Sequence, residues 1–278
     1  MFALIIRARE CRCSAILFLL VALSACERKA VDSTSVVNTV KLSDRQISSL
    51  ATKKIFFGHQ SVGADVVQGI RDLMAEDPSL KLNIVASASP ESIHAPAFVE
   101  SPIGENRKPQ SKNQAFAAIL ANGMGAQGGV AMYKYCYVDI DLSTDVKRLF
   151  DDYRNQVSAL KSQYPRLTIV HITVPLTTVD MDMKSWVKIL LGRPTIRDVA
   201  AKRNEFNQLL RQTYVGTDPI FDLAEIESTL PDGARSYFTR GTQQIYTLTP
   251  EYTTDGGHLN AVGRRAAATA LLQILADL

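Results

Sequence analysis

A serine in the first quarter of the chain and an Asp-x-x-His pair near its end are the residues whose types and spacing could do chemistry. Ser61 lies in Gly-His-Gln-Ser-Val-Gly at 58–63, and Asp255 and His258 lie in Thr-Asp-Gly-Gly-His-Leu-Asn at 254–260. A serine hydroxyl attacks a carbonyl when a base takes its proton, and a histidine base needs a carboxylate to fix its tautomer. The spacing therefore predicts Ser61 as nucleophile, His258 as base and Asp255 as the group that orients the base.

Each stretch on its own also has a plainer interpretation. Ser61 precedes a predicted helix and could act only as its cap, while Asn260 could cap the helix that follows the late stretch. The early stretch lacks the Gly-x-Ser-x-Gly spacing of a nucleophile elbow, because position 59 is His. At a helix N-terminus, however, backbone N–H groups and the helix dipole could stabilise an oxyanion beside Ser61. The two stretches predict a reactive site only when they are taken together.

Strand and helix patterns alternate along the chain between these two stretches. Short apolar runs predict five strands, at residues 54–58, 82–86, 129–137, 167–174 and 219–223. Apolar residues at helical spacing predict helices at residues 44–50, 62–73, 113–120, 144–164, 197–214 and 261–278. Two long loops, one at 87–110 and one around Trp186 and Pro194, are candidate walls of a binding cleft.

This alternation predicts right-handed crossovers and a mostly parallel sheet covered by helices on both faces. The expected fold class is therefore α/β, a three-layer α/β/α sandwich around a mostly parallel five-stranded sheet. Such sheets bind ligands at the carboxyl ends of their strands. Because Ser61 follows the first strand, we expect it at that edge of the sheet.

Together, the early serine stretch and the late Asp-x-x-His stretch resemble those of the SGNH (GDSL-like) hydrolase superfamily. The resemblance covers roughly residues 53–278. It implies an SGNH or flavodoxin-like sandwich in which Ser61 is the nucleophile and Asp255 and His258 are its partners. The early stretch reads Gly-His-Gln-Ser in this chain, where the superfamily has Gly-Asp-Ser.

The resemblance also implies an oxyanion hole. The backbone N–H of Ser61 would be one donor, and Gly104, in the loop after the second predicted strand, would be another, with the Asn106 side chain assisting. Members of the superfamily often supply an asparagine after the third strand, and this chain has none there. Lys134, Tyr137 or Asn106 would have to replace it, or that donor would be absent. Lys134 and Tyr137, together with His59, are also expected as possible pocket residues.

The activity implied by the resemblance is cleavage of an acyl or acetyl ester on a carbohydrate or a lipid. The expected partner is thus a small-molecule or glycan ester, and no cofactor is expected. Two alternatives stay open. One is O-acyl transfer to a glycan through the same covalent intermediate, and the other is a non-catalytic lipoprotein of the same fold that binds a glycan or a partner.

The remaining histidines do not predict a metal site. His59, His94 and His171 lack a ligand spacing such as His-x-x-x-His. His59, two residues before Ser61, could line the pocket or orient the substrate, whereas His171 lies in an apolar strand and is expected in the core. The formal charge is only +3 and no basic patch is evident, so a nucleic-acid partner is not expected.

The first 26 residues have the pattern of a bacterial lipoprotein signal. Three arginines precede an apolar stretch at 15–23, which is shorter than the ~20 residues that a membrane span needs. Leu-Ser-Ala-Cys at 23–26 resembles a lipobox, in which the cysteine receives acyl chains such as palmitate and becomes the mature N-terminus. An ordinary signal peptide is the alternative. If Cys26 is lipidated, we expect its lipid to be the only contact with the membrane, because the apolar stretch is too short to span one.

These patterns divide the chain into three parts. Residues 1–25 are predicted to be the signal peptide, 26–42 a flexible tether and 43–278 the hydrolase-like domain. The expected location is the bacterial cell envelope on its periplasmic side, with the outer membrane favoured over the inner. Cys136 is the one cysteine left in the domain, and its apolar surroundings predict a buried, inert thiol.

Overall fold

The computed structural model describes residues 42–179, 191 and 193–278. The predicted signal peptide, Cys26 and the loop segment around Trp186 lie outside the described residues. Within the described part of the chain, no helix is long and apolar enough to cross a membrane.

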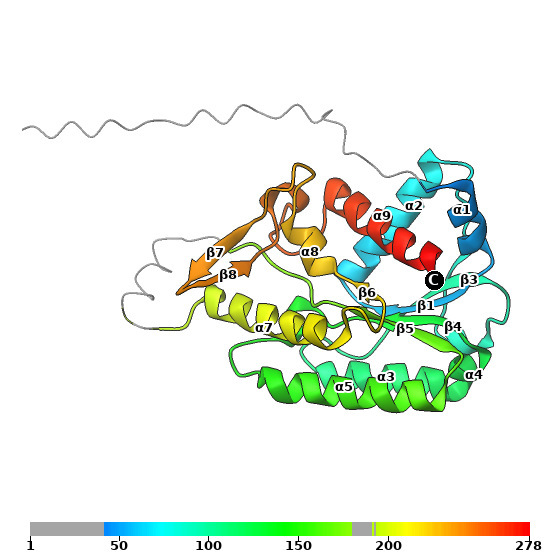
Figure 1. Ribbon diagram of the computed structural model, residues 1–278, viewed down its shortest axis with the longest axis horizontal. Helices are drawn as coiled ribbons and strands as arrows, with labels where there is room; N and C mark the ends of the chain where they lie inside the picture. Colours follow the sequence, from blue (N-terminus) through cyan, green and yellow to red (C-terminus); the bar gives the residue numbers. More distant parts are fainter. Residues whose placement is uncertain (1–41, 180–190, 192) are drawn as a thin grey trace, which may run out of the picture. The chain divides into compact units, whose positions relative to one another are not determined.

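A six-stranded sheet, parallel at every pairing, forms the middle layer (Figure 1). In sequence order its strands are β1 (Lys54–His59), β2 (Ile84–Ala86), β3 (Ala97–Pro102), β4 (Gly129–Tyr133), β5 (Leu167–Ile172) and β6 (Ile220–Phe221). Their spatial order is β2-β3-β1-β4-β5-β6. Successive side chains point to opposite faces, so Ile55 and Phe57 join one core cluster and Phe56 joins the other. Both faces of the sheet are therefore buried.

Helices cover the two faces. The upper layer of Figure 1 holds α1 (Asp44–Ala51), α2 (Val62–Glu76), α8 (Leu223–Ser228) and α9 (Ala261–Asp277). The lower layer holds α3 (Pro109–Ile119), α4 (Gly125–Gln127), α5 (Val146–Gln163) and α7 (Ile196–Tyr214). The prediction of a three-layer α/β/α sandwich with a mostly parallel sheet is confirmed.

The prediction of five strands is wrong, because β3 lies inside the segment 87–110 that was expected to be a loop. β3 is inserted between β2 and β1. The predicted strand at 129–137 is also too long, since β4 ends at Tyr133. The chain then turns, and the backbone N–H of Cys136 donates to the Asp139 carboxylate.

Some short elements have no counterpart in the sequence prediction. These are α8, the antiparallel hairpin of β7 (Tyr237–Arg240) and β8 (Gln243–Tyr246), the short 3₁₀ turns Pro90–Ser92, Tyr137–Asp139 and Pro250–Tyr252, and a π-helical turn at Leu120–Met124. All of them have six residues or fewer, which is too short for a hydrophobic period to stand out.

Close packing of α2 against α9 brings the two ends of the domain together. Gly69 of α2 makes this approach possible, because a Cβ at that position would lie 2.4 Å from the carbonyl oxygen of Arg264 in α9. Val66, Ile70 and Leu271 are fully buried in the same upper core. The N-terminus of α2, which carries Ser61, therefore lies near the turn that precedes α9.

Candidate active site

Ser61 occupies the junction between β1 and α2 in a strained backbone conformation. Its φ is 54° and its ψ is −118°, and among the described residues Arg107 is the one other non-glycine residue with a positive φ. A residue with a Cβ pays roughly 1–3 kcal/mol for such a conformation. Ser61 is the N-cap residue of α2, yet its side chain makes no capping hydrogen bond. The interpretation of this serine as a mere helix cap is therefore wrong, and its hydroxyl is directed elsewhere.

That hydroxyl contacts His258. Ser61 Oγ lies 2.7 Å from His258 Nε2, and His258 Nδ1 lies 2.7 Å from Asp255 Oδ2. The other Asp255 oxygen accepts the backbone N–H groups of Gly257 at 2.9 Å and of His258 at 2.8 Å. Hydrogen bonds from the backbone and side chain of His258, together with that from Gly257, hold the pKa of Asp255 well below its usual range. Asp255 is thus kept ionised while it bonds the imidazole.

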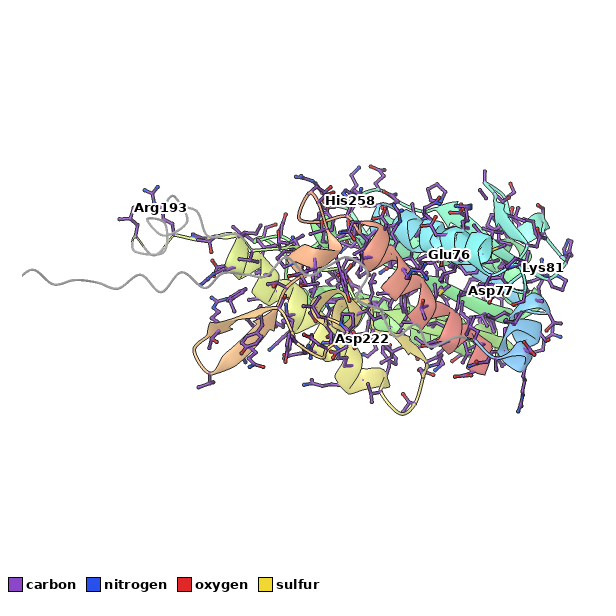
Figure 2. The ribbon with its side chains drawn as sticks, turned by 90° about the horizontal axis from the view of Figure 1, so that it is seen from above. Glu76, Asp77, Lys81, Arg193, Asp222 and His258 are labelled. Atoms are coloured by element: carbon purple, nitrogen blue, oxygen red, sulfur yellow. The ribbon has the colours of Figure 1, made fainter. Side chains whose placement is uncertain are left out.

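The turn that carries Asp255 and His258 is fixed on several sides. Figure 2 labels His258 in this turn, just before α9. Gly256 has a φ of 83° and its carbonyl accepts the N–H of Thr178 at 2.9 Å. Asn260 caps α9, as the sequence allowed, through its side-chain oxygen to the N–H groups of Val262 and Gly263. About half of each reacting side chain stays exposed, 46% for His258 and 54% for Asp255.

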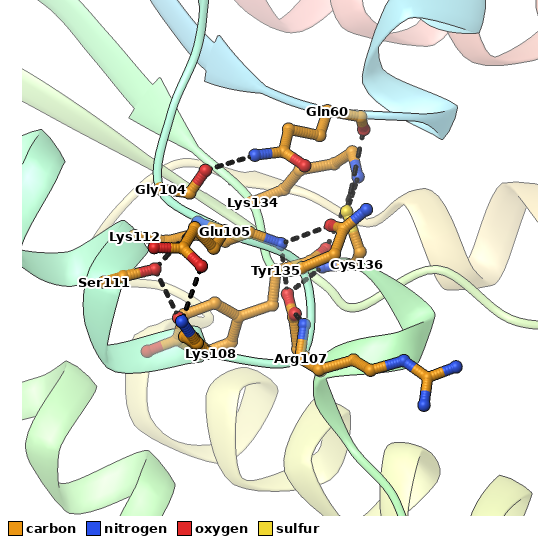
Figure 3. A network of polar contacts seen from close by, with 12 residues as sticks. Gln60, Gly104, Glu105, Arg107, Lys108, Ser111, Lys112, Lys134, Tyr135 and Cys136 are labelled. Atoms are coloured by element: carbon orange, nitrogen blue, oxygen red, sulfur yellow. Dashed lines mark hydrogen bonds and ion pairs between the residues drawn. The ribbon is translucent and has the colours of Figure 1, made fainter.

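The Gly104 loop is joined to the residue before Ser61. The Gln60 side-chain amide donates to the carbonyl of Gly104, at 2.5 Å (Figure 3), and to that of Ile103, at 2.9 Å. Gly104 has a φ of 58°, and a Cβ there would lie 2.6 Å from the backbone nitrogen of Lys112. The described peptide bonds are all trans, so the Gly104 N–H points opposite to the Ile103 carbonyl and hence away from the Gln60 amide. One glutamine therefore sets the orientation of this backbone.

Lys112 and Lys134 lie in a neighbouring polar network (Figure 3), to which Asn106 also belongs through its bond with Lys112. The Lys112 ammonium donates to the Asn106 side-chain oxygen at 3.1 Å and forms a buried ion pair with Asp139. Lys134 is 1% exposed, and its Nζ lies 3.4 Å from Cys136 Sγ and 3.5 Å from the Tyr135 carbonyl. Burial lowers the pKa of Lys134. Contrary to the sequence expectation, Lys134 does not line an open pocket, and the Asn106 oxygen is held by Lys112.

His59 also has a different place from the one expected. It is 5% exposed, and its Nε2 lies 2.9 Å from a Glu100 oxygen, while the other Glu100 oxygen binds Arg71. A Cβ on Gly63 would lie 2.3 Å from the Cβ of His59, so the ring packs against the start of α2. Burial lowers the pKa of His59. The prediction that His59 lines the pocket is wrong, because this ring supports the β1–α2 turn from within.

Tyr137 lies beside the exposed face of the site. Its ring centroid is 6.1 Å from that of His258. It lines a hollow of about 320 Å³ together with Thr177, Thr178, Ile196, Asp255, Gly256 and Gly257. The buried Arg203 supports this hollow, since its guanidinium donates to the Tyr137 carbonyl at 2.8 Å and to Thr177 Oγ1 at 2.9 Å. Burial lowers the pKa of Arg203 to about 10.

Sequence reasoning missed Gln60, Asp65 and Arg203. Asp65 comes four residues after Ser61, one turn into α2, so its position carried a usable signal. Gln60 and Arg203 act through contacts with loops distant in sequence, and no local pattern marks them. His171 and Cys136 are buried as predicted. In the described part of the chain, no group of three or more His, Cys, Asp or Glu side chains could hold a metal ion.

No family model and no curated protein matches this chain. Among solved structures, it is similar to a GDSL-like lipase from Bacteroides thetaiotaomicron, at 12% identity over 83% of this chain and 93% of that chain, with a TM-score of 0.48. It is also similar to an acetyl xylan esterase, at 13% identity over 79% and 98% of the two chains, with a TM-score of 0.44. A third is the periplasmic domain of a lipopolysaccharide acetyltransferase from Salmonella ser. Paratyphi A, at 12% identity over 81% and 85%, with a TM-score of 0.39. GDSL-like structures are thus among those the chain is similar to, and at these identities the likeness concerns the fold alone.

Proposed function

We propose that this protein is a serine hydrolase of the SGNH type that cleaves a carboxylic ester, an acyl or acetyl group on a carbohydrate or a lipid. The observation that carries the proposal is the unbroken line of contacts from Ser61 Oγ to His258 and on to Asp255, both at 2.7 Å. These distances lie within the reach that a nucleophile, its base and an orienting carboxylate need.

In the proposed reaction, Ser61 Oγ attacks the ester carbonyl carbon while His258 Nε2 takes the hydroxyl proton. Asp255 fixes the imidazole through Nδ1 and stabilises its positive charge. When the tetrahedral intermediate collapses, His258 returns the proton to the leaving alkoxide, and the acyl group stays on Ser61. Water then attacks the acyl-enzyme, His258 again takes and returns a proton, and the carboxylic acid leaves. The exposure of His258 and Asp255 gives this water access to the site.

The oxyanion of the intermediate needs hydrogen-bond donors. We infer that the N–H of Ser61 supplies the first, since it lies at the N-terminus of α2, where the helix dipole also favours negative charge. The N–H of Gly104 is the second proposed donor, in a loop that Gln60 holds by two carbonyls. Loss of one such donor typically lowers the rate by ~10²–10³.

Labelling with a fluorophosphonate tests the function, because this reagent bonds covalently to an activated serine. The wild-type protein should be labelled, and Ser61→Ala and His258→Ala should not. Ser158→Ala is the matched control, since it removes an exposed serine in α5 and should leave labelling unchanged. Persistent labelling of the Ser61→Ala protein would refute the assignment of the nucleophile.

Product analysis separates hydrolysis from the alternatives. Incubation of the labelling-competent protein with p-nitrophenyl acetate should release free acetate. Acetyl groups that appear on an added glycan in place of free acetate would identify an acyltransferase. Absence of both labelling and turnover would favour a binding protein of the same fold.

We also propose that the protein is anchored in the bacterial cell envelope through a lipid on Cys26. The support is the basic start, the short apolar stretch and the Leu-Ser-Ala-Cys sequence at 23–26. Processing should then be blocked by globomycin and by Cys26→Ala. Unchanged release and maturation of the Cys26→Ala protein would contradict lipidation and point to an ordinary signal peptide.

A further inference from the structure

Asp65 joins the helix that carries Ser61 to the turn that carries His258. It lies four residues after Ser61, one turn into α2. Its Oδ2 accepts the backbone N–H of Leu259 at 3.1 Å, and Leu259 directly follows His258. The carboxylate therefore holds the peptide next to the imidazole that Ser61 contacts.

Two adjacent residues of the turn thus contact the N-cap and the first turn of α2. His258 bonds Ser61 through its side chain, and Leu259 bonds Asp65 through its backbone. The far side of the turn is held separately, because the N–H of Asn260 donates to the Tyr252 carbonyl at 2.8 Å. Removal of the Asp65 oxygen would break only the backbone contact between this turn and α2. That contact lies next to His258, whose imidazole must stay in reach of Ser61 Oγ.

The Asp65 carboxylate is partly buried, and burial disfavours its charged form. Burial raises the pKa of Asp65, whereas the Leu259 N–H and the nearby positive charges of Arg264, Lys134 and a protonated His258 act in the opposite direction. Leu259 itself is 4% exposed, and its backbone N–H makes this hydrogen bond to the Asp65 carboxylate. A buried N–H that loses its acceptor is unfavourable, so the turn should rearrange when this oxygen is removed.

We propose that Asp65 is a positioning residue for the Ser61 reaction, which holds His258 in reach of Ser61 by accepting the Leu259 N–H. This inference rests on the proposed function of Ser61. Asp65 touches no reacting atom, so its effect should fall on the rate of the chemical step and little on substrate binding.

Asp65→Ala and Asp65→Asn separate positioning from general stability. Alanine removes the acceptor, whereas asparagine keeps a side-chain oxygen in nearly the same place. Asp72→Ala, in the same helix and also bonded to neighbours on the surface, is the matched control. The measurements are kcat and KM for p-nitrophenyl acetate, the rate of fluorophosphonate labelling, and the thermal unfolding curve of each variant.

Asp65→Ala should lower kcat and the labelling rate by roughly 10- to 100-fold with KM within about threefold, since a misplacement near 1 Å can cost about 10² in rate. Asp65→Asn should have a kcat and a labelling rate within about fivefold of wild type. The control Asp72→Ala should have the wild-type values. Equal losses in the Asn and Ala variants, or a folded Asp65→Ala protein with wild-type kcat, would overturn the inference while Ser61-dependent labelling stands. If Ser61→Ala is labelled like wild type, the proposed function fails first, and this inference fails with it.

Discussion

Replacement of Ser61 by glycine should abolish labelling and yet give a protein more stable than replacement by alanine. Both changes remove the hydroxyl that contacts His258, so the loss of that hydrogen bond cancels in the comparison. What differs is the Cβ, which alanine keeps at a φ of 54° and a ψ of −118°. Glycine adopts this region without strain.

The size of the effect follows from two opposing quantities. Because glycine is not strained in this conformation, the folded glycine variant is stabilised by roughly 1–3 kcal/mol relative to the alanine variant. The greater conformational freedom of glycine in the unfolded chain lowers this stabilisation by roughly 0.4–1 kcal/mol. The glycine variant should therefore be the more stable by about 1 kcal/mol, or roughly 2–4 °C in Tm for a domain of this size.

Urea unfolding followed by far-ultraviolet circular dichroism measures this difference. Ser158 in α5 provides a control of opposite sign, because in a helix interior Ser158→Gly should be less stable than Ser158→Ala by about 1 kcal/mol. If Ser61→Gly is no more stable than Ser61→Ala, the backbone at Ser61 is not strained and the reasoning is wrong.

Three further predictions concern the surroundings of the site. Gly69→Ala places a Cβ against the Arg264 carbonyl and should destabilise the fold by about 1–3 kcal/mol in urea unfolding; an unchanged midpoint would contradict the close approach of α2 and α9. Gln60→Ala frees the Gly104 loop and should lower kcat for p-nitrophenyl acetate roughly tenfold or more; wild-type kcat would show that the loop needs no such support. Burial raises the pKa of Glu227 from its usual 4.5 to about 8, so its contribution to stability is present below pH 4.5 and is lost as the pH rises towards 8. Glu227→Gln should therefore gain stability relative to wild type between pH 5 and pH 8.5 in thermal unfolding; a pH-independent difference would contradict this.

The residues brought together at the site were predictable because they flank regular elements. Ser61 comes directly after a buried strand and before an amphipathic helix, and Asp255 and His258 come directly before the last helix. In a parallel sheet, the residue that follows a strand lies at the carboxyl edge, where ligands bind, and the packing of α9 on α2 brings Asp255 and His258 to Ser61 there. Period-two alternation could also have placed His59 correctly, since it shares a strand face with Ile55 and Phe57 and therefore points into the upper core.

The missing strand and the polar network were not predictable from local patterns. β3 has six residues, lies in a segment rich in proline and serine, and contains Glu100. That carboxylate is stabilised by His59 and Arg71, which are 41 and 29 residues away in sequence. Lys112 is likewise fully buried because it pairs with Asp139 across 27 residues. In these cases a distant partner decides where a charged residue lies.

Mapping of the fluorophosphonate adduct by peptide mass spectrometry tests the central claim most directly. The account predicts one modified peptide, with the added mass on Ser61, and loss of that adduct in the folded His258→Ala protein. An adduct on another residue, or an adduct on Ser61 that forms at the wild-type rate without His258, would contradict the proposal that Ser61, His258 and Asp255 act as one catalytic unit.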